Sequence, residues 1–586
     1  MKRIISVLLV LAMCAVLFTG CTRDENDKGP IIRMYISSYP RSLDPSAYQV
    51  SAETTKLFGL IYEALTAVDD EGKVVPALAE SWYGLYDNKD ELYKMYFVLN
   101  ETKWSDGADV TADDVIFAWK RILMPESNSP YASLLYLIDN AKDVKSGVVT
   151  IDALGLAAVD DTLLEVTFDQ TAVHDQTTLD NAVALFAETV SSLALVPLRE
   201  NVVSKGDDWM TTASEATTNG PFKVQTMEYE SQIILERSTY YRLTEDDKFD
   251  KYVKPYKIVI DYYSNGQNAA QWQQDRFNNG DIYYLGSFTP DGYATFEDLK
   301  TSNMLSSSAV YFNNTDPLLD DARVRKALSM VIDRTALVQA VDPTFVPATG
   351  WVPHGVFNTS AEQTFREASS LSLSATADVD GAKALLREAG VSGGEIKLTY
   401  RSSNFDKLTE NTANFIKSAW EQLGFTVTLE RLGGVNYTQS YDTRAFQAIL
   451  TDVVGNMTDA FGYLAPFARY YSGQVVSVSL EDEAYTPHIT GFESDSYDAL
   501  IDSIVFEVDR TKRAELLHQT EAALLDEMPA CPLYFYTESY VVNEDLSKVG
   551  DYYFGYRDFC KIKLKDYLKV NAAYESEVAA EEGQGA

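Results

Sequence analysis

The spacing of hydrophobic positions changes repeatedly along this chain and predicts short strands alternating with amphipathic helices. Apolar runs predict strands over residues 31–36, 95–99, 163–168, 257–262, 425–429 and 533–536. Apolar stripes at helical spacing predict helices from Thr111 onward and over residues 320–338, 380–389, 408–423, 497–508 and 511–526. Thr111 is expected to cap the first of these helices. No repeat of about 20–50 residues occurs, so the fold class is mixed α/β.

The N-terminus has the charge and hydrophobicity pattern of a secretory signal. Lys2 and Arg3 precede an apolar run, and small residues close the segment at position 20. The uncharged stretch from residue 4 to residue 20 is shorter than the ~20 residues that a membrane-spanning helix needs. We therefore predict a signal peptide over residues 1–20 and a protein that acts outside the cytoplasmic membrane.

The residue that follows this signal is a cysteine, Cys21. Its position resembles the lipobox of bacterial lipoproteins, in which this thiol is diacylated, although Phe18 stands where leucine is usual. Residues 21–30 are polar and predict a flexible tether. Lipidation would hold the protein on the outer face of the cytoplasmic membrane, or in the periplasm of a two-membrane cell. A plain signal with an unmodified Cys21 is the alternative.

Composition and charge narrow the function classes. The chain has 586 residues, 46% of them hydrophobic and 23% charged, which is globular and long enough for roughly three or more domains. Acidic residues outnumber basic ones by 87 to 49, which gives a formal net charge of −38. A chain this negative repels a phosphate backbone, so nucleic acid is excluded as the main partner. The 37 tyrosines suit either a wet binding surface or an ordinary core.

The histidines and charged motifs indicate no metal or nucleotide chemistry. His174, His354, His488 and His518 stand at no ligand spacing, and the chain has no His-Glu-x-x-His helix. A Gly-Lys-Ser/Thr phosphate loop does not occur either, so no nucleotide site is expected. We expect no cofactor and no metal, and an extracytoplasmic hydrolase is the least favoured alternative.

Cysteine use excludes a disulfide-stapled fold. Of four cysteines, Cys14 leaves with the signal peptide and Cys21 would carry the lipid. Cys531 and Cys560 remain, and two thiols cannot staple a fold of this size. They either form one disulfide near the C-terminus or are both buried thiols, which is the interpretation we favour.

Eight short motifs occur in order along the chain. They are Arg41-Ser42-Leu43-Asp44-Pro45, Lys103-Trp104-Ser105-Asp106-Gly107 with 110–115, Ser129-Pro130-Tyr131-Ala132-Ser133, Thr218-Asn219-Gly220-Pro221-Phe222, 323–328 with 332–334, 384–390, 498–501 and 529–534. In this order and spacing the chain resembles the oligopeptide- and dipeptide-binding lipoproteins of ABC importers, the extracytoplasmic solute-binding protein family 5. The resemblance covers about residues 31–565. Most of these motifs are expected to fix the scaffold, for example as tight turns, rather than to touch ligand.

The resemblance implies a periplasmic-binding-protein-like fold of the class II type, with three domains in two lobes that close by a hinge. Mixed sheets flanked by helices are expected. The expected division is domain I at 31–69, 200–309 and 537–570, domain II as an insertion at 70–199, and domain III at 310–536. Two strands should cross between the lobes near 310–312 and 534–536. The tail, 571–586, has no apolar period and is predicted to be a disordered acidic segment.

For the ligand site, the resemblance implies a peptide gripped by its main chain as an added strand, with its side chains in hydrated pockets. Tyr131 and Tyr437 match aromatic residues of the cleft wall. Arg444 matches a basic residue that can meet a ligand carboxylate. Core packing is the alternative role for both tyrosines, and an exposed loop position is the alternative for Arg444.

One segment departs from the family pattern. Members that bind free peptides place an aspartate a few residues after a tryptophan, where it pairs with the α-ammonium group of the ligand. Here Val453 stands at the tryptophan position and Asn456 at the aspartate position. A neutral amide accepts a hydrogen bond without forming an ion pair, so Asp452 or Asp459 would supply the charge from a shifted position. The sequence leaves open whether a free amino terminus is read.

The function implied by the resemblance is capture of short peptides between two lobes and delivery to a membrane permease. The expected partners are the permease subunits with their associated ATPase, and the membrane through the lipid anchor. The protein is expected to be a monomer and not an enzyme. A peptide-sensing lipoprotein and a binder of a non-peptide solute are the alternatives, because both would use the same cleft.

Overall fold

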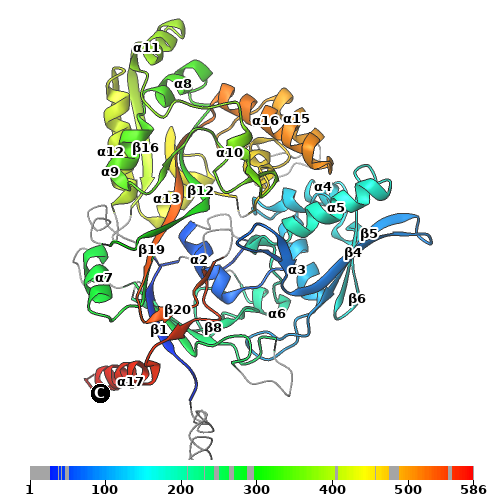
Figure 1. Ribbon diagram of the computed structural model, residues 1–586. Coiled ribbons are helices and arrows are strands. Elements are labelled where there is room, and N and C mark those ends of the chain that lie inside the picture. The colour runs from blue at the N-terminus through cyan, green and yellow to red at the C-terminus, as the bar shows by residue number, and fades with distance from the viewer. Residues whose placement is uncertain are drawn as a thin grey trace, which may run out of the picture.

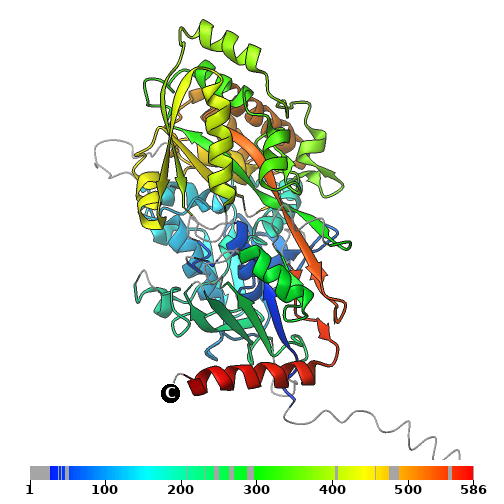
Figure 2. The ribbon, with the colours of Figure 1, turned by 90° about the vertical axis from the view of Figure 1, so that its left-hand side faces the viewer.

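The computed structural model describes residues 27–36, 39–40, 42–46, 52–206, 209–229, 231–242, 250–262, 269–286, 296–402, 407–455, 457–473, 488–551 and 557–584. Within these ranges an eleven-stranded mixed sheet runs through the whole molecule (Figure 1, Figure 2). From edge to edge its strands are β17 (Phe425–Leu432), β16 (Gly394–Arg401), β18 (Ala448–Val454), β12 (Lys300–Phe312), β19 (Ala530–Val542), β11 (Tyr284–Leu285), β1 (Ile31–Tyr35), β10 (Lys257–Asp261), β9 (Gln232–Arg237) and β8 (Phe222–Glu228). The eleventh strand, β13 (Val346–Pro347), pairs with β19 beside this path.

Strands β12 and β19 join two lobes of this sheet. Lobe 1 holds β11, β1, β10, β9 and β8, and lobe 2 holds β18, β16 and β17. β12 and β19 are antiparallel and pair along almost their whole length, with a register break between Asn303 and Ser307. These are the two strands predicted to cross between the lobes. The register break lies before the predicted point at 310–312, because β18 already pairs with β12 from Ser306 onward and holds that part of β12 inside lobe 2.

A second, four-stranded antiparallel sheet belongs to lobe 1 (Figure 1). It consists of β4 (Ala79–Asp87), β5 (Leu92–Leu99), β7 (Leu163–Thr167) and β6 (Leu156–Asp160), in this order. Helix α5 (Gln176–Thr189) packs directly on the sheet, and a Cβ on Gly84 would lie 2.6 Å from Val183. Helix α3 (Ala112–Leu123) begins at the predicted cap, Thr111, whose N–H donates to the Asp114 carboxylate at 2.9 Å.

The helices of lobe 2 surround its part of the large sheet (Figure 1). They are α8 (Ala322–Met330), α9 (Arg334–Val341), α10 (Phe365–Ala368), α11 (Val379–Glu388), α12 (Leu408–Glu421), α13 (Gly434–Asp442), α14 (Phe461–Leu464), α15 (Asp495–Val505) and α16 (Arg510–Glu527). The prediction of one helix over 320–338 is wrong, because α8 and α9 are separate. Asp333 causes the break: its carboxylate accepts the Ala336 N–H at 2.7 Å and starts α9.

The remaining helices and the short strand pairs complete the described elements. The helices are α2 (Ala52–Ile61), α4 (Ala141–Lys145), α6 (Glu200–Val203) and α7 (Ala269–Asn278). The strand pairs are β2 (Thr66–Val68) with β3 (Val74–Pro76), β14 (Phe357–Ser360) with β15 (Gln363–Thr364), β20 (Leu546–Ser547) with β23 (Lys563–Leu564), and β21 (Gly550–Asp551) with β22 (Arg557–Asp558). One hydrophobic cluster of buried side chains extends through both lobes.

Two of the sequence motifs meet in lobe 1 and hold each other in place. The ring nitrogen of the buried Trp104 donates to the Asp114 carboxylate at 3.0 Å, which joins the turn to α3. The Ser105 N–H donates to the Thr218 carbonyl at 2.9 Å, and the Thr218 N–H donates to the Ser105 hydroxyl at 3.1 Å. Gly220 packs so closely on the end of α2 that a Cβ would lie 2.5 Å from its backbone. These residues position backbone segments, as expected for a scaffold.

The C-terminal tail forms a helix, α17 (Tyr567–Gln584), so the prediction of a disordered segment is wrong. The helix lies at the pole of lobe 1, beside the start of β1 (Figure 2). Asn571 accepts the Ile31 N–H at 2.9 Å and donates to the Gly29 carbonyl, and Glu577 pairs with Arg33 at 2.7 Å. These contacts with residues from the other end of the chain supply the order that the tail sequence lacks. Neither α17 nor any other helix in the described ranges has the length and apolar character to cross a membrane.

Cys531 and Cys560 are free thiols, as in the favoured alternative, but the expectation that both are buried is correct only for Cys531. Cys531 is buried and Cys560 is half-buried. Burial raises the pKa of both thiols, so neither is a reactive thiolate at neutral pH. The core of this protein therefore forms without a covalent link between these two residues.

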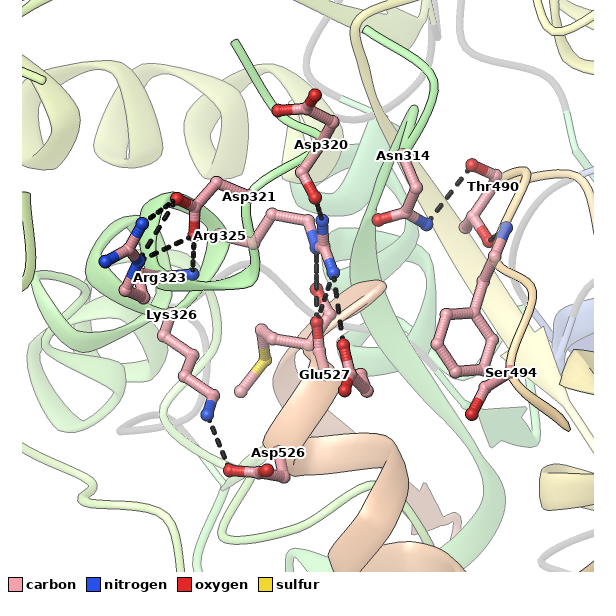
Figure 3. Close-up of polar contacts among 12 residues, drawn as sticks. Asn314, Asp320, Asp321, Arg323, Arg325, Lys326, Thr490, Ser494, Asp526 and Glu527 are labelled. Carbon is pink, nitrogen blue, oxygen red and sulfur yellow. Dashed lines mark hydrogen bonds and ion pairs between the residues drawn. The ribbon is translucent and has the colours of Figure 1, made fainter. Parts of the chain in front are cut away.

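Arg325, from the arginine-rich motif, holds the C-terminal end of α16 (Figure 3). Its buried guanidinium donates, at 2.5–3.2 Å, to the main-chain carbonyls of Leu319, Asp320, Glu527 and Met528. The last carbonyls of a helix have no partner within the helix, so a cation placed here satisfies them. The nearest carboxylate, that of Glu527, is 4.0 Å away, so the main-chain contacts dominate.

Replacement of Arg325 tests this role. Arg325→Met keeps the length of the side chain but leaves the carbonyls unsatisfied. We expect the free energy of unfolding to fall by about 3 kcal/mol. Differential scanning calorimetry should record a midpoint of unfolding lower by roughly 5 °C. Arg323→Ala is the matched control, because Arg323 is exposed and pairs with Asp321 on the surface. Equal shifts for the two variants would mean that Arg325 is not a structural cap.

Candidate ligand-binding site at the junction of the lobes

An unpaired strand edge lies in lobe 2 next to the strands that join the lobes. β18 is parallel to β16, but the pairing covers only Ala448 and Ile449. From Leu450 to Val454, β18 pairs with β12 on one side, and no strand of the described residues pairs with it on the other. Exposed edges offer main-chain N–H and C=O groups to an added strand. This segment can therefore bind an extended chain.

Tyr437 lies beside this edge, on α13. Its hydroxyl donates to the Leu450 carbonyl at 2.8 Å, which orients the first residue of the unpaired segment. The tyrosine is 8% exposed and also belongs to the hydrophobic cluster of lobe 2. Burial raises the pKa of its hydroxyl, so the group stays protonated and keeps donating. Tyr437 thus combines the two roles that the sequence left open, core packing and a position at the candidate site.

Asp452 is the exposed charged residue of the edge segment. Its carboxylate accepts a hydrogen bond from the Tyr536 hydroxyl at 2.6 Å, across from β18 to β19. Tyr536 is itself buried, and the Phe345 ring packs on it edge to face. The Tyr536 contact holds the carboxylate in one place on the edge. Of the aspartates expected to supply a shifted charge, Asp452 is the one on the part of β18 that pairs with β12 alone, and its carboxylate contacts Tyr536 of β19.

Tyr131 reaches the same region from lobe 1. It precedes a short 3-10 turn and is 5% exposed, close enough to Tyr463 of lobe 2 to contribute to the raised pKa of that tyrosine, whose main cause is burial. The Tyr463 hydroxyl donates to the Leu305 carbonyl at 2.8 Å, inside the register break of β12. A Cβ on Gly455, the residue after β18, would lie 2.0 Å from the Tyr463 ring. Tyr463 therefore packs on the residue that follows β18 and holds the Leu305 carbonyl of β12.

Two of the expected site residues have structural partners instead. Arg444 donates to the Ile489 carbonyl at 2.9 Å and to the His488 carbonyl at 3.3 Å. Its guanidinium therefore holds the main chain at residues 488–489 in place. Asp459 is buried, and its carboxylate pairs with Arg513 at 2.9 Å. Neither group is directed to a ligand in this arrangement, because each is held by its own lobe. Asn456 and Cys21 lie outside the described residues.

The lobes also touch through residues that sequence reasoning missed. Lys142 of α4 pairs with Asp502 of α15 at 2.6 Å, and Glu188 of α5 pairs with Arg510 of α16 at 2.7 Å. α4 and α5 face α15 and α16 across the junction (Figure 1). No sequence signal marks these four residues, because single charged positions on helices are common and their partners lie more than 300 residues away.

Residues 73–474 match the family model described as Bacterial extracellular solute-binding proteins, family 5 Middle. The match covers well over half of the chain, and the chain belongs to this family. The resemblance found in the sequence motifs is therefore confirmed, and the expectation of a solute-binding protein outside the cytoplasm with it.

Individual relatives agree with this assignment. The oligopeptide-binding protein OppA of Bacillus subtilis is 28% identical over 93% of this chain and 96% of its own length. The structure of the Escherichia coli murein tripeptide binding protein MppA has a TM-score of 0.72 at 23% identity, covering 92% of this chain and 98% of that one. A structure of MppA described as the unliganded open form has a TM-score of 0.53 at 24% identity, covering 89% and 94%. The expected fold is confirmed.

The Asp459–Arg513 pair gives a prediction on stability and pH. Burial alone would raise the pKa of Asp459, but Arg513 outweighs it and holds the pKa below its ordinary value. The pair therefore stabilises the fold fully above about pH 4, and this contribution is lost as the pH falls through the lowered folded-state pKa. Asp459→Asn leaves a buried unpaired guanidinium and should cost about 3–5 kcal/mol at pH 7.

Thermal unfolding of wild type and Asp459→Asn at several pH values measures this effect. The gap between the two midpoints should be widest at neutral pH and shrink below about pH 4. Asp452→Asn is the matched control, because Asp452 is exposed and its loss should leave the midpoint nearly unchanged. A gap for Asp459→Asn that does not depend on pH would contradict the assigned pairing.

Proposed function

We propose that this chain is the substrate-binding lipoprotein of an ABC importer and captures short peptides between its two lobes. The observation that supports this most strongly is the segment Leu450 to Val454 of β18, which pairs with β12 on one side and with no strand of the described residues on the other. A peptide that lies along this segment gains main-chain hydrogen bonds whatever its side chains are. Such binding suits an importer that must accept many sequences.

The proposed recognition uses groups from both lobes. The peptide adds as a strand to β18, and Tyr437 keeps the Leu450 carbonyl in place. Asp452, held by Tyr536, pairs with the α-ammonium group of the peptide. Tyr131 closes the site from the side of lobe 1, next to Tyr463. In this proposal a free amino terminus is read, but by Asp452 instead of the residue at position 456.

Export and anchoring belong to the same proposal. The signal over residues 1–20 directs export, and Cys21 carries the lipid. The fold already holds Asp27, which accepts a hydrogen bond from Tyr567 of α17. Only five residues, 22–26, then separate Cys21 from Asp27, a reach of about 20 Å. Lobe 1 would stay close to the membrane, where the permease and its ATPase receive the peptide.

The domain division remains part of the proposal. Domain I consists of 31–69, 200–309 and 537–570, domain II of 70–199, and domain III of 310–536. The four-stranded sheet falls inside 70–199, and strands β13 to β18 fall inside 310–536, which supports the division.

We also propose that the chain has no catalytic role. Its one Gly-x-Ser-x-Gly sequence, at 390–394, leads from helix α11 into strand β16. A nucleophile elbow needs the opposite order, in which a strand leads through a tight turn into a helix. Ser392 therefore lies in an ordinary connection and not at the tip of an elbow.

Native mass spectrometry of freshly purified residues 22–586 tests the class of solute. We expect additional masses that fragment as a ladder of short peptides, because main-chain recognition retains a mixture. A single non-peptide mass would keep the solute-binding role but overturn peptide as the solute.

Asp452→Asn tests the reading of the amino terminus. Isothermal titration with a pooled tri- to pentapeptide library should show affinity at least about tenfold weaker than wild type, because the ion pair with the α-ammonium group of the peptide is lost. N-acetylation of the same library should weaken binding to wild type by a similar factor and have little effect on the variant. Asp459→Asn, whose carboxylate serves the fold, should bind the free peptides as wild type does. Equal affinity of wild type for free and acetylated peptides would remove Asp452 from this role while leaving strand addition intact.

A further inference from the structure

The two lobes make a direct contact surface that lies beside the candidate site, and we call it the seam. It consists of Tyr136, Lys142 and Glu188 of lobe 1 with Tyr471, Asp502 and Arg510 of lobe 2. Backbone contact between Ser129 and Gly473 continues it toward Tyr131. The seam therefore joins the lobes through side chains and backbone of the chain itself.

Gly473 brings the two backbones closer than any other residue would allow. A Cβ at this position would lie 2.1 Å from the Ser129 carbonyl oxygen and 2.7 Å from the Cα of Pro130. Its φ of +71° is also in the region that favours glycine. The residue is thus suited to a cross-lobe contact that exists only when the lobes are together.

The aromatic part of the seam is buried away from solvent. Tyr136 and Tyr471 are each 1% exposed, with ring centroids 5.4 Å apart. The Tyr136 hydroxyl donates to the Tyr470 carbonyl at 3.1 Å. Lys142 donates to the Tyr471 hydroxyl at 3.0 Å and pairs with Asp502 at 2.6 Å, so both polar ends of the ring pair are satisfied. Closure therefore buries two large rings without leaving a polar group unpaired.

The second charged pair of the seam, Glu188 with Arg510, is more buried than Lys142 with Asp502. The Glu188 side chain is 9% exposed and that of Arg510 24%. Glu188 accepts from Arg510 at 2.7 Å and from the hydroxyl of Thr458, which is 1% exposed. A buried ion pair roughly balances its own loss of hydration, so it adds little net attraction but enforces one alignment of the lobes. The buried rings supply the attraction between the lobes, and the charged pairs fix how the lobes align.

We propose that the seam closes the lobes of this chain in the absence of ligand, and that Gly473, Lys142, Glu188 and Arg510 are positioning residues that set how readily ligand enters and leaves. A ligand would then enter through transient opening of a closed form instead of causing closure. The exit rate of ligand depends on the seam, although none of its residues needs to touch the ligand. The proposal goes beyond the nature of the solute and holds whether or not that solute is a peptide.

The experiment measures the distance between the lobes in ligand-free protein. Spin labels at cysteines introduced in place of Val148 and Val435, which are 72% and 84% exposed, report on lobe 1 and lobe 2. Bound solute is removed by unfolding and refolding, and double electron–electron resonance gives the distance distribution. We expect one short distance for the ligand-free wild type. A broad or long distribution that shortens only when the peptide library is added would overturn the proposal.

Gly473→Ala is the decisive variant, and Gly390→Ala is its matched control. The two glycines have φ values of +71° and +72°, so both variants meet the same backbone strain. A Cβ on Gly390 has no atom within 4 Å, whereas a Cβ on Gly473 meets the Ser129 carbonyl oxygen. Gly473→Ala should shift most of the ligand-free population to a longer distance, and Gly390→Ala should keep the short one. The same distribution for both variants would overturn the proposal.

A charge exchange checks that opening does not result from misfolding. Lys142→Asp alone places two carboxylates together and should lengthen the distance, and Lys142→Asp with Asp502→Lys should restore it. Lys326→Met removes a surface Lys–Asp pair of similar length within lobe 2, 2.5 Å to Asp526, and should change nothing. Restored distance in the exchanged pair supports the seam, and failure to restore it in a protein with wild-type thermal stability would count against it.

Discussion

The structure depends on the antiparallel pairing of β12 with β19. Both strands continue from one lobe into the other, and each is buried along most of its length. Their main-chain hydrogen bonds cannot be given up in a buried sheet without leaving unsatisfied N–H and C=O groups. We expect movement between the lobes at the breaks in this pairing, which lie between Asn303 and Ser307 and between Ser308 and Ala309. The expected hinge therefore lies where the hydrogen-bond ladder between two otherwise paired strands is interrupted.

The position of the candidate site follows from this hinge. β18 is fixed against β12 over its whole length, whereas β16 leaves it after Ile449. An open edge of this kind invites aggregation in most proteins. Here it lies at the junction of the lobes, where Tyr131 and Tyr463 approach the end of β18.

Carboxylates of this chain occur in two different settings, buried beside an arginine or exposed at a strand edge. Buried carboxylates such as Asp459 and Glu521 have arginine partners, Arg513 and Arg366, and fix the packing of lobe 2. Asp452 is exposed at the strand edge and is oriented by a tyrosine hydroxyl. A net charge of −38 therefore says little about function by itself. What separates a binding carboxylate from a structural one is its burial and its partner, and neither is a property of composition.

The sequence by itself determined the alternation of strands and helices, the cap at Thr111 and the family, because these depend on residues close together in the chain or on motifs kept in order. Only the tertiary structure decided that Asp459 and Arg444 serve the scaffold, that the C-terminal tail is helical, and that Gly473 meets the other lobe. Each of these outcomes rests on a partner from a distant part of the chain. Local periodicity reports which face of an element is apolar, but it carries no information about which distant group that face will meet.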